Sequence, residues 1–359
     1  MRHLISTTLF ATWAILIAAC TQPAGETIIN EKTKVFEDGS VYVGDLTDGK
    51  RHGQGTHLPF EGDRYRGEWA NDQKSGQGRL IYKDGSIYEG SFLNDVPEGQ
   101  GVRTFESEAF GYKYSGTFAA GKQAGRGEEQ KRNGKVIEVY KGEFHDGKRN
   151  GKGTLTRKLP GLKDFKYVGD FKEGVPHGQG NMVNHDQSTY SGPFQNSLPH
   201  GSGGQKTLSN GDTYKGDWVR GMMHGQGILV TSSGDRYEGK FNQNRRTGKG
   251  IMTFGKTSPF NGDKYEGDFV NGKPHGQGTY TKANGIVYTG QLKDGVPHGQ
   301  GIATTPAGEQ KTGNWENGKE VDVKTTTTSP DAPKRKDSSK EPSANEAKPN
   351  SESTTPEQN

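Results

Sequence analysis

The residues Tyr265–Gly278 read Tyr-Glu-Gly-Asp-Phe-Val-Asn-Gly-Lys-Pro-His-Gly-Gln-Gly, and this stretch decides the fold because it recurs along most of the chain. Tyr265, Gly267 and Phe269 alternate with polar residues, so they share one face of a short strand. The following residues are rich in Gly and Pro and predict a turn, after which Gly276 and Gly278 open a second strand. The stretch therefore predicts a small antiparallel β-hairpin.

The pattern occurs eleven times, at intervals of 23 to 28 residues. Each copy opens with a tyrosine: Tyr42, Tyr65, Tyr88, Tyr114, Tyr140, Tyr167, Tyr190, Tyr214, Tyr237, Tyr265 and Tyr288. A glycine follows two residues later, a large apolar residue four residues later, and two more glycines eleven and thirteen residues later. A partial copy begins at Thr312. One hairpin is too small to bury its aromatic face, so stability must accumulate between neighbouring copies.

The pattern resembles the MORN repeat (membrane occupation and recognition nexus). Its fullest copies include Tyr167, Gly169, Phe171, Gly174, His177, Gly178 and Gly180, and again Tyr265, Gly267, Phe269, Gly272, His275, Gly276 and Gly278. The resemblance implies an all-β fold, an elongated twisted single-layer ribbon of 11–12 stacked hairpins over residues 35–320. All extra residues follow the second glycine of the closing pair, so insertions such as 159–164 and 257–261 are expected as loops along one rim.

The composition fits a repeat protein and excludes a thick core. Only 27% of the residues are hydrophobic, whereas glycine alone accounts for 56 residues, and 14 Tyr and 15 Phe are present. The formal net charge is only +4, which gives no general attraction to nucleic acid. Residues 321–359 are polar and rich in Thr, Ser, Pro, Lys and Glu, and we expect them to form a disordered tail.

The first twenty residues resemble the signal of a bacterial lipoprotein. Residues 1–19 have a short basic start and an uncharged apolar run, as in a secretory signal peptide. They end in Ile17-Ala18-Ala19 before Cys20, the only cysteine. The resemblance implies cleavage before Cys20, acylation with chains such as palmitate, and residues 20–34 as a tether to the membrane, in family terms the outer membrane of the bacterial envelope. The competing interpretation is an ordinary signal peptide with a coincidental cysteine.

No catalytic, metal or cofactor site is predicted. His52, His177, His200, His224, His275 and His298 occupy one repeat position, about 10 Å from copy to copy, which is too far for adjacent copies to share one zinc ion. We therefore expect these histidines to stabilise turns. Some lipid kinases carry MORN repeats beside a kinase domain, but a phosphatidylinositol phosphate kinase activity would need residues that this repeat pattern does not supply.

Two functions stay open at this point. The first is a non-catalytic, membrane-anchored scaffold that binds a protein partner. The second is binding of anionic phospholipid or of a surface polymer by the ribbon, favoured by basic pairs such as Lys50-Arg51 and Arg245-Arg246. Interleaved acidic residues, among them Glu68 and Asp170, argue against the second. Unpaired edge strands at either end predict an end-to-end homodimer wherever a terminal cap fails.

Overall fold

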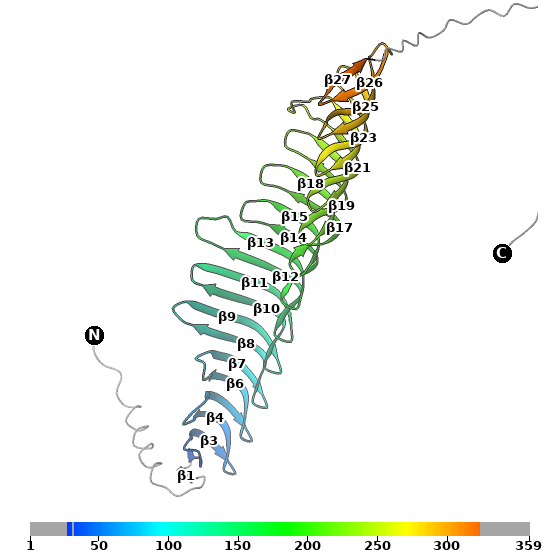
Figure 1. Cartoon of the computed structure of the whole chain (residues 1–359). Coiled ribbons are helices and arrows are strands. Elements are labelled where there is room, and N and C mark those ends of the chain that lie inside the picture. Colours follow the sequence, from blue (N-terminus) through cyan, green and yellow to red (C-terminus); the bar gives the residue numbers. More distant parts are fainter. Residues whose placement is uncertain (1–26, 31, 324–359) are drawn as a thin grey trace, which may run out of the picture.

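The computed structural model describes residues 27–30 and 32–323, and every regular element in these ranges is a β-strand. Twenty-seven strands form a single sheet, each antiparallel to its neighbour, and the sheet is a long twisted ribbon (Figure 1). The predicted all-β ribbon is confirmed. The described ranges contain no helix that is long and apolar enough to cross a bilayer. The expected signal peptide, Cys20 and residues 324–359 of the expected tail lie outside them.

The strands follow one another along the ribbon in chain order. The first thirteen are β1 (Thr27–Asn30), β2 (Thr33–Val35), β3 (Val41–Thr47), β4 (Lys50–Leu58), β5 (Arg64–Ala70), β6 (Gln73–Ile81), β7 (Ile87–Leu93), β8 (Val96–Glu106), β9 (Phe110–Ala119), β10 (Lys122–Asn133), β11 (Val136–His145), β12 (Lys148–Lys158) and β13 (Phe165–Lys172). The others are β14 (Val175–Val183), β15 (Thr189–Gln195), β16 (Leu198–Pro199), β17 (Gly201–Thr207), β18 (Thr213–Val219), β19 (Met222–Val230), β20 (Arg236–Asn242), β21 (Arg245–Thr253), β22 (Lys264–Val270), β23 (Lys273–Thr281), β24 (Val287–Lys293), β25 (Val296–Thr304), β26 (Gln310–Glu316) and β27 (Lys319–Val323).

The turn within a repeat is shorter than the sequence suggests. Between β13 and β14 it consists of Glu173 and Gly174, with φ values of 51° and 89°. Positive φ at both central residues is the mark of a type I′ turn, whose twist matches that of the strands it joins. The segment Val175–Gly178, which we expected as part of the turn, therefore already belongs to the second strand.

Gly178 marks a β-bulge instead of a turn. Gly169 pairs with Gly180 and Phe171 pairs with Pro176, so β14 holds two extra residues between these pairs. Gly178 has a φ of +66°, and the backbone N–H of Gln179 donates to Asp170 Oδ2 at 2.9 Å. The carboxylate satisfies a donor that the bulge frees from the ladder. The acidic residue three positions after the tyrosine thus has a structural role.

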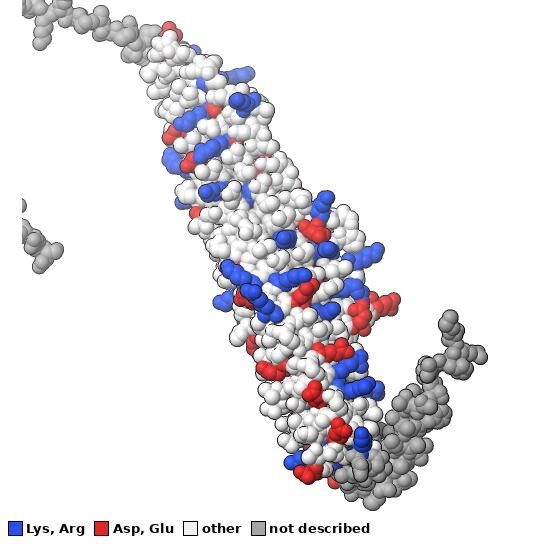
Figure 2. All heavy atoms as spheres, turned by 180° about the vertical axis from the view of Figure 1, so that it is seen from behind, with Lys and Arg blue, Asp and Glu red and all other residues white. Residues whose placement is uncertain are grey.

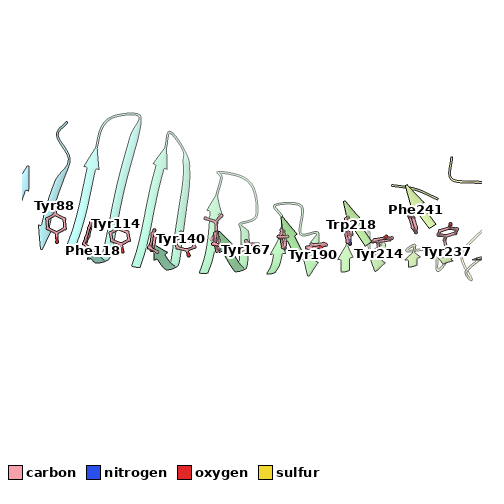
Figure 3. Packing of buried hydrophobic residues seen from close by; sticks show 14 of the residues in the cluster. Tyr88, Tyr114, Phe118, Tyr140, Tyr167, Tyr190, Tyr214, Trp218, Tyr237 and Phe241 are labelled. Carbon is pink, nitrogen blue, oxygen red and sulfur yellow. The ribbon is translucent and has the colours of Figure 1, made fainter. Parts of the chain in front are cut away.

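The core is a row of aromatic rings along one face, which we call the aromatic face (Figure 3). The Tyr167 ring contacts Phe171 of its own repeat and Phe194 of the next edge-to-face, with centroids 5.2 and 4.9 Å apart. Its hydroxyl donates to the carbonyl oxygen of Asp170 at 2.9 Å. Tyr167 is 0% exposed, although the sheet has a single layer, because its ring packs against Phe171 and against Phe194 of the next repeat. Burial therefore depends on the neighbouring repeats, as the sequence predicts.

The two ends of the sheet differ from the expected boundaries. The sheet begins at Thr27, so part of the expected tether 20–34 lies in β1 and β2. At the other end, Gly301 pairs with Gly313 and Ala303 pairs with Lys311. The partial repeat therefore starts at Lys311, not Thr312: with two-residue alternation, Lys311, Gly313 and Trp315 occupy the Tyr, Gly and aromatic positions.

The ribbon is widest in its middle. β8, β10 and β12 contain 11, 12 and 11 residues, whereas β6 and β14 contain 9 each. The extra residues of the repeats that begin at Tyr88 and Tyr114 thus extend paired strands and do not form loops. The segment 159–164 is a loop, as expected, and the longest connection runs between Thr253 and Lys264.

Candidate functional site

The repeat residues singled out in the sequence all have positions explained by the hairpin. Tyr167 and Phe171, like Tyr265 and Phe269, lie in the buried aromatic row. Gly169, Gly180, Gly267 and Gly278 lie beneath the tyrosine rings, Gly174 and Gly272 lie in turns, and Gly178 and Gly276 lie at bulges. The periodic residues therefore build the ribbon, and a specific site has to be sought where the repeats differ.

The histidines do not occupy turns. His177 and His275 lie inside β14 and β23, because the turns before them end at Gly174 and Gly272, three residues before each histidine. In the repeat of Tyr214, His224 pairs directly with Asp217, and its carbonyl oxygen accepts a hydrogen bond from the Tyr214 hydroxyl at 3.2 Å. Among the residues of the sheet that the structure describes, no three His, Cys, Asp or Glu side chains gather as a metal site would require.

One inward position carries different residue types from repeat to repeat, so the chemistry of the aromatic face changes along the ribbon. It lies on the second strand directly opposite the tyrosine and is occupied by His57, Leu80, Arg103, Glu129, Leu155, Met182, Lys206, Leu229, Met252, Tyr280 and Ala303. Most of these side chains are apolar. Arg103 and Glu129 are consecutive exceptions, and both lie in the widened middle.

Glu129 belongs to a buried charged cluster. Its Oε2 accepts hydrogen bonds from Arg149 Nε at 2.8 Å and Nη2 at 2.5 Å, and Glu129 and Arg149 are only 5% and 8% exposed. Arg149 Nη2 also donates to Glu138 Oε1 at 2.7 Å, and Arg157 Nη2 donates to Glu138 Oε2 at 2.7 Å. The Arg149 guanidinium lies 5.0 Å from the centroid of the Tyr140 ring. These side chains therefore link β10, β11 and β12 beside the Tyr140 ring of the aromatic row.

The electrostatics of this cluster favour the charged forms. Burial alone would raise the pKa of Glu138, but hydrogen bonds from Arg149 and Arg157 outweigh it, so the pKa lies below its usual range. Each carboxylate thus has its partners inside the protein. A cluster satisfied in this way stabilises one geometry of the hairpin and leaves little capacity for an outside ligand.

One repeat earlier, a cavity of about 550 Å³ opens beside the aromatic row. Its lining includes Arg103, Phe105, Phe110, Tyr112, Phe118 and Gln123. The Arg103 guanidinium lies 4.7 Å from the Tyr82 ring centroid, and Nη2 donates to Ser86 Oγ at 3.2 Å. Arg103 thus turns away from the middle of the hairpin, whereas Arg149 extends over Tyr140. In this repeat the position of Arg149 is held by the shorter Gln123, opposite Phe118, and the cavity beside it is the candidate functional site.

The rest of the surface carries mixed charge. Figure 2 shows basic and acidic side chains interspersed along the visible face of the ribbon. Several are paired across strands, such as Lys249 with Asp268 at 2.9 Å and Arg79 with Glu89 at 2.8 Å. Arg51, which lies in β4 next to the turn, likewise contacts Asp72 Oδ1 at 3.1 Å. Such pairing reduces the attraction of these cations for an anionic surface.

Sequence reasoning missed the charged cluster and the cavity. Most of their residues lie in the five strands β8 to β12, and no spacing rule places Arg149 beside Glu129. Two signals do mark the region: the longer intervals that follow Tyr88, Tyr114 and Tyr140, and the charged residues at a position that is mostly apolar elsewhere. Neither signal shows where the long side chains point.

The fold and the periodic core define a β-repeat protein in which each hairpin packs only on its neighbours. A family model described as the MORN repeat matches ten segments, namely 42–58, 65–87, 88–108, 114–136, 140–158, 167–189, 214–236, 237–257, 265–287 and 288–310. These segments cover more than half of the chain, which therefore belongs to the MORN repeat family. None of the curated proteins compared with the chain is significantly similar to it.

The eleventh predicted repeat, at Tyr190, is not among the matched segments, yet the structure contains it. Tyr190 and Phe194 are 1% and 3% exposed, like their counterparts. Gly204 pairs with Gly216, and Gln205 pairs with Ser191, so Gly204 and not Gly203 takes the place beside the tyrosine ring. The repeat thus holds one extra residue before its second glycine, which corrects the spacing that we assigned to it.

Proposed function

We propose that this protein is a non-catalytic, membrane-anchored scaffold that binds a protein partner at the bacterial cell envelope. MORN repeats and an all-β repeat fold are typical of binding or scaffold modules, and no enzyme domain is detected beside them. The anchor is Cys20, acylated after removal of residues 1–19. This part of the proposal rests on the sequence, because Cys20 lies outside the described residues.

The observation that carries the proposal is the division between periodic and non-periodic residues. The periodic Tyr, Gly and Phe residues build the core, and the rings are buried where a partner cannot reach them: Tyr88 is 0% exposed and Phe92 is 4% exposed. The non-periodic residues around Arg103 and Phe110 line an open cavity. A repeat ribbon with a non-repeated cavity beside its aromatic row suits specific attachment of a partner.

Crosslinking in intact cells tests the scaffold. The full chain is expressed with an affinity tag, crosslinked, purified under denaturing conditions and examined for attached proteins. The matched control is a chain with Gly180→Ala, in which the ribbon is destabilised but the surface composition is nearly unchanged. We expect one protein or a small set with the wild type and a smaller yield of the same proteins with the control. Recovery of lipid alone would contradict the proposal.

The anchor has a separate test. Labelling of cells with an alkyne analogue of palmitate should mark the wild-type protein, and Cys20→Ser should abolish the label and release the protein from the membrane fraction. An unlabelled wild-type protein would show that the amino-terminal segment acts as an ordinary signal peptide. That result would remove the anchor from the proposal and leave the scaffold unaffected.

Binding of anionic phospholipid is the second candidate, and the paired surface charges speak against it. The decisive measurement is co-sedimentation of unacylated Cys20→Ser protein with vesicles of phosphatidylglycerol at low and high salt. The scaffold proposal expects no sedimentation at physiological salt. Binding that salt abolishes would establish electrostatic recognition of headgroups and favour the alternative.

A further inference from the structure

The cavity beside Arg103 has the chemistry of a ligand site, and we propose that it binds a carboxylate attached to a large apolar group. A ligand of this class has two sources: the carboxyl-terminal residue of a partner protein, or a free aromatic or aliphatic acid. Where the carboxylate belongs to a partner, the inference rests on the proposed scaffold function and specifies how the partner is held.

The apolar part of the ligand is indicated by the rings around the cavity. Phe110 is 36% exposed, and its ring centroid lies 6.2 Å from that of Phe105. Tyr112 and the buried Phe118 complete the apolar lining. An apolar group that enters this space removes exposed aromatic surface from water, which is the main source of affinity in such pockets.

The carboxylate is indicated by Arg103, the cation of the site with the most free hydrogen-bonding capacity. A guanidinium has five N–H donors, and among the described residues that of Arg103 makes one hydrogen bond, to Ser86 Oγ. Asp84, which also lines the cavity, forms a long ion pair with Arg103, with Oδ2 4.0 Å from Nη2, but it accepts no hydrogen bond from the guanidinium, so the other N–H donors are free for a closer carboxylate. The planar guanidinium matches a carboxylate, and a buried ligand group strengthens that pairing.

The other polar groups of the cavity are engaged with protein partners. Lys122 Nζ pairs with Asp146 Oδ1 at 2.5 Å, and Gln123 donates through Nε2 to the Tyr112 hydroxyl. One guanidinium with unused N–H donors suits a singly charged carboxylate better than a phosphate, which usually collects several cationic or N–H groups. This difference separates the proposed ligand from a phospholipid headgroup.

The position of Arg103 within the repeat argues for a specific role. The same position holds Leu80 in the preceding repeat and Leu155 two repeats later, both nearly buried. A leucine is therefore compatible with the hairpin and would place an apolar side chain where Arg103 presents its charge. Arg103→Leu thus removes the cation and is expected to leave the ribbon folded.

The binding test uses the full chain and three probes. The first is a fluorescein-labelled five-residue peptide that ends in phenylalanine with a free carboxylate, the second is the same peptide with an amidated end, and the third is 3-phenylpropanoate as a competitor. We expect saturable binding of the acid peptide and at least about tenfold weaker binding of the amide. Displacement by 3-phenylpropanoate at comparable concentration identifies a free acid as a sufficient ligand, whereas failure to displace assigns the ligand to a peptide end.

Two variants locate the binding. Arg103→Leu is expected to weaken binding of the acid peptide about tenfold or more. The matched control is Lys206→Leu, since Lys206 is the cation at the same position of the repeat that begins at Tyr190; it should bind as the wild type does. Circular dichroism verifies that both variants are folded. Equal binding by wild type and Arg103→Leu, equal loss in both variants, or no binding of any probe overturns the inference.

The crosslinking experiment distinguishes failure of this site from failure of the scaffold. A partner that is recovered with the wild type and lost with Arg103→Leu supports both. A partner that is recovered equally with the two proteins leaves the scaffold function standing and shows that the partner binds elsewhere on the ribbon.

Discussion

The ring of Tyr167 lies so close to Gly180 that a Cβ added at Gly180 would be 2.5 Å from both Cε2 and the hydroxyl oxygen of the ring. The same contact recurs beside every buried tyrosine from Tyr42 to Tyr288. The hydroxyl also donates to a backbone carbonyl three residues later, so a shift of the ring away from Gly180 would strain or break this hydrogen bond. The glycine is therefore needed for its lack of a side chain.

Gly180→Ala should destabilise the ribbon by about 1–3 kcal/mol, since the Tyr167 ring must shift and lose its contacts with Phe171 and Phe194. The urea midpoint followed by circular dichroism measures this loss. Gly174→Asn is the control, because a Cβ at Gly174 meets nothing within 4 Å and asparagine tolerates the positive φ of this turn. An unchanged midpoint for Gly180→Ala would show that the ring is not confined as described.

Adjacent glycines in the repeat that begins at Tyr190 test the shifted register. Gly204→Asn should be strongly destabilising, because an added Cβ would lie 2.4 Å from the Tyr190 hydroxyl oxygen and 2.6 Å from Trp218 Cδ1. Gly203→Asn should cost little, since nothing lies within 4 Å and its φ of +77° suits asparagine. Thermal unfolding compares the two. If Gly203→Asn were the less stable variant, Gly203 and not Gly204 would be the glycine beside the Tyr190 ring.

Alkaline pH should unfold the protein through the tyrosine row. Burial raises the pKa of Tyr88 from 10.0 to about 12, and Tyr114, Tyr140 and Tyr237 are raised to about 12 by the same cause. A pKa raised by folding means that the stability contributed by the neutral tyrosine is complete below pH 10 and is lost as the pH rises toward about 12. Tyrosinate absorbance and circular dichroism should therefore change together. Tyrosinate formation near pH 10 without loss of structure would contradict this.

Arg149→Met should destabilise the wide middle by about 3–5 kcal/mol, because Glu129 and Glu138 lose a shared buried partner. The double variant Glu129→Leu with Arg149→Pro should recover most of this loss, since other repeats carry Leu155 and Pro176 at these positions. Chemical denaturation at neutral pH compares the three proteins. A double variant that is no more stable than Arg149→Met would show that the loss does not come from an unpaired Glu129.

The pH dependence of this cluster has a definite sign. The pKa of Glu138 is lowered by folding, so its contribution to stability is present above the unfolded value of 4.5 and is lost as the pH falls through the folded value. Removal of Arg149 should therefore cost less stability in acid than at neutral pH. A cost that is independent of pH would argue against the ion pairs as its cause.

Much of the fold follows from the sequence because its determinants are local and repeated. The alternation of Tyr167, Gly169 and Phe171 specifies which side chains share a face, and eleven copies specify that the hairpins stack. The errors also have local causes. The two-residue turn at Glu173 and Gly174 and the bulge at Gly178 both require positive φ, and glycine content alone does not distinguish turn from bulge.

The sequence by itself determined a ribbon of hairpins with a buried aromatic row and a lipoprotein-like start, since these depend on residue types at fixed spacing. Only the tertiary structure decided the register at Gly204 and Lys311, because cross-strand pairing is set by hydrogen bonds between separate strands. It alone also decided that Arg149 extends over Tyr140 while Arg103 lies beside a cavity one repeat earlier. The reason is physical: long side chains of one type take directions set by their neighbours, and the repeat pattern contains no information about those directions.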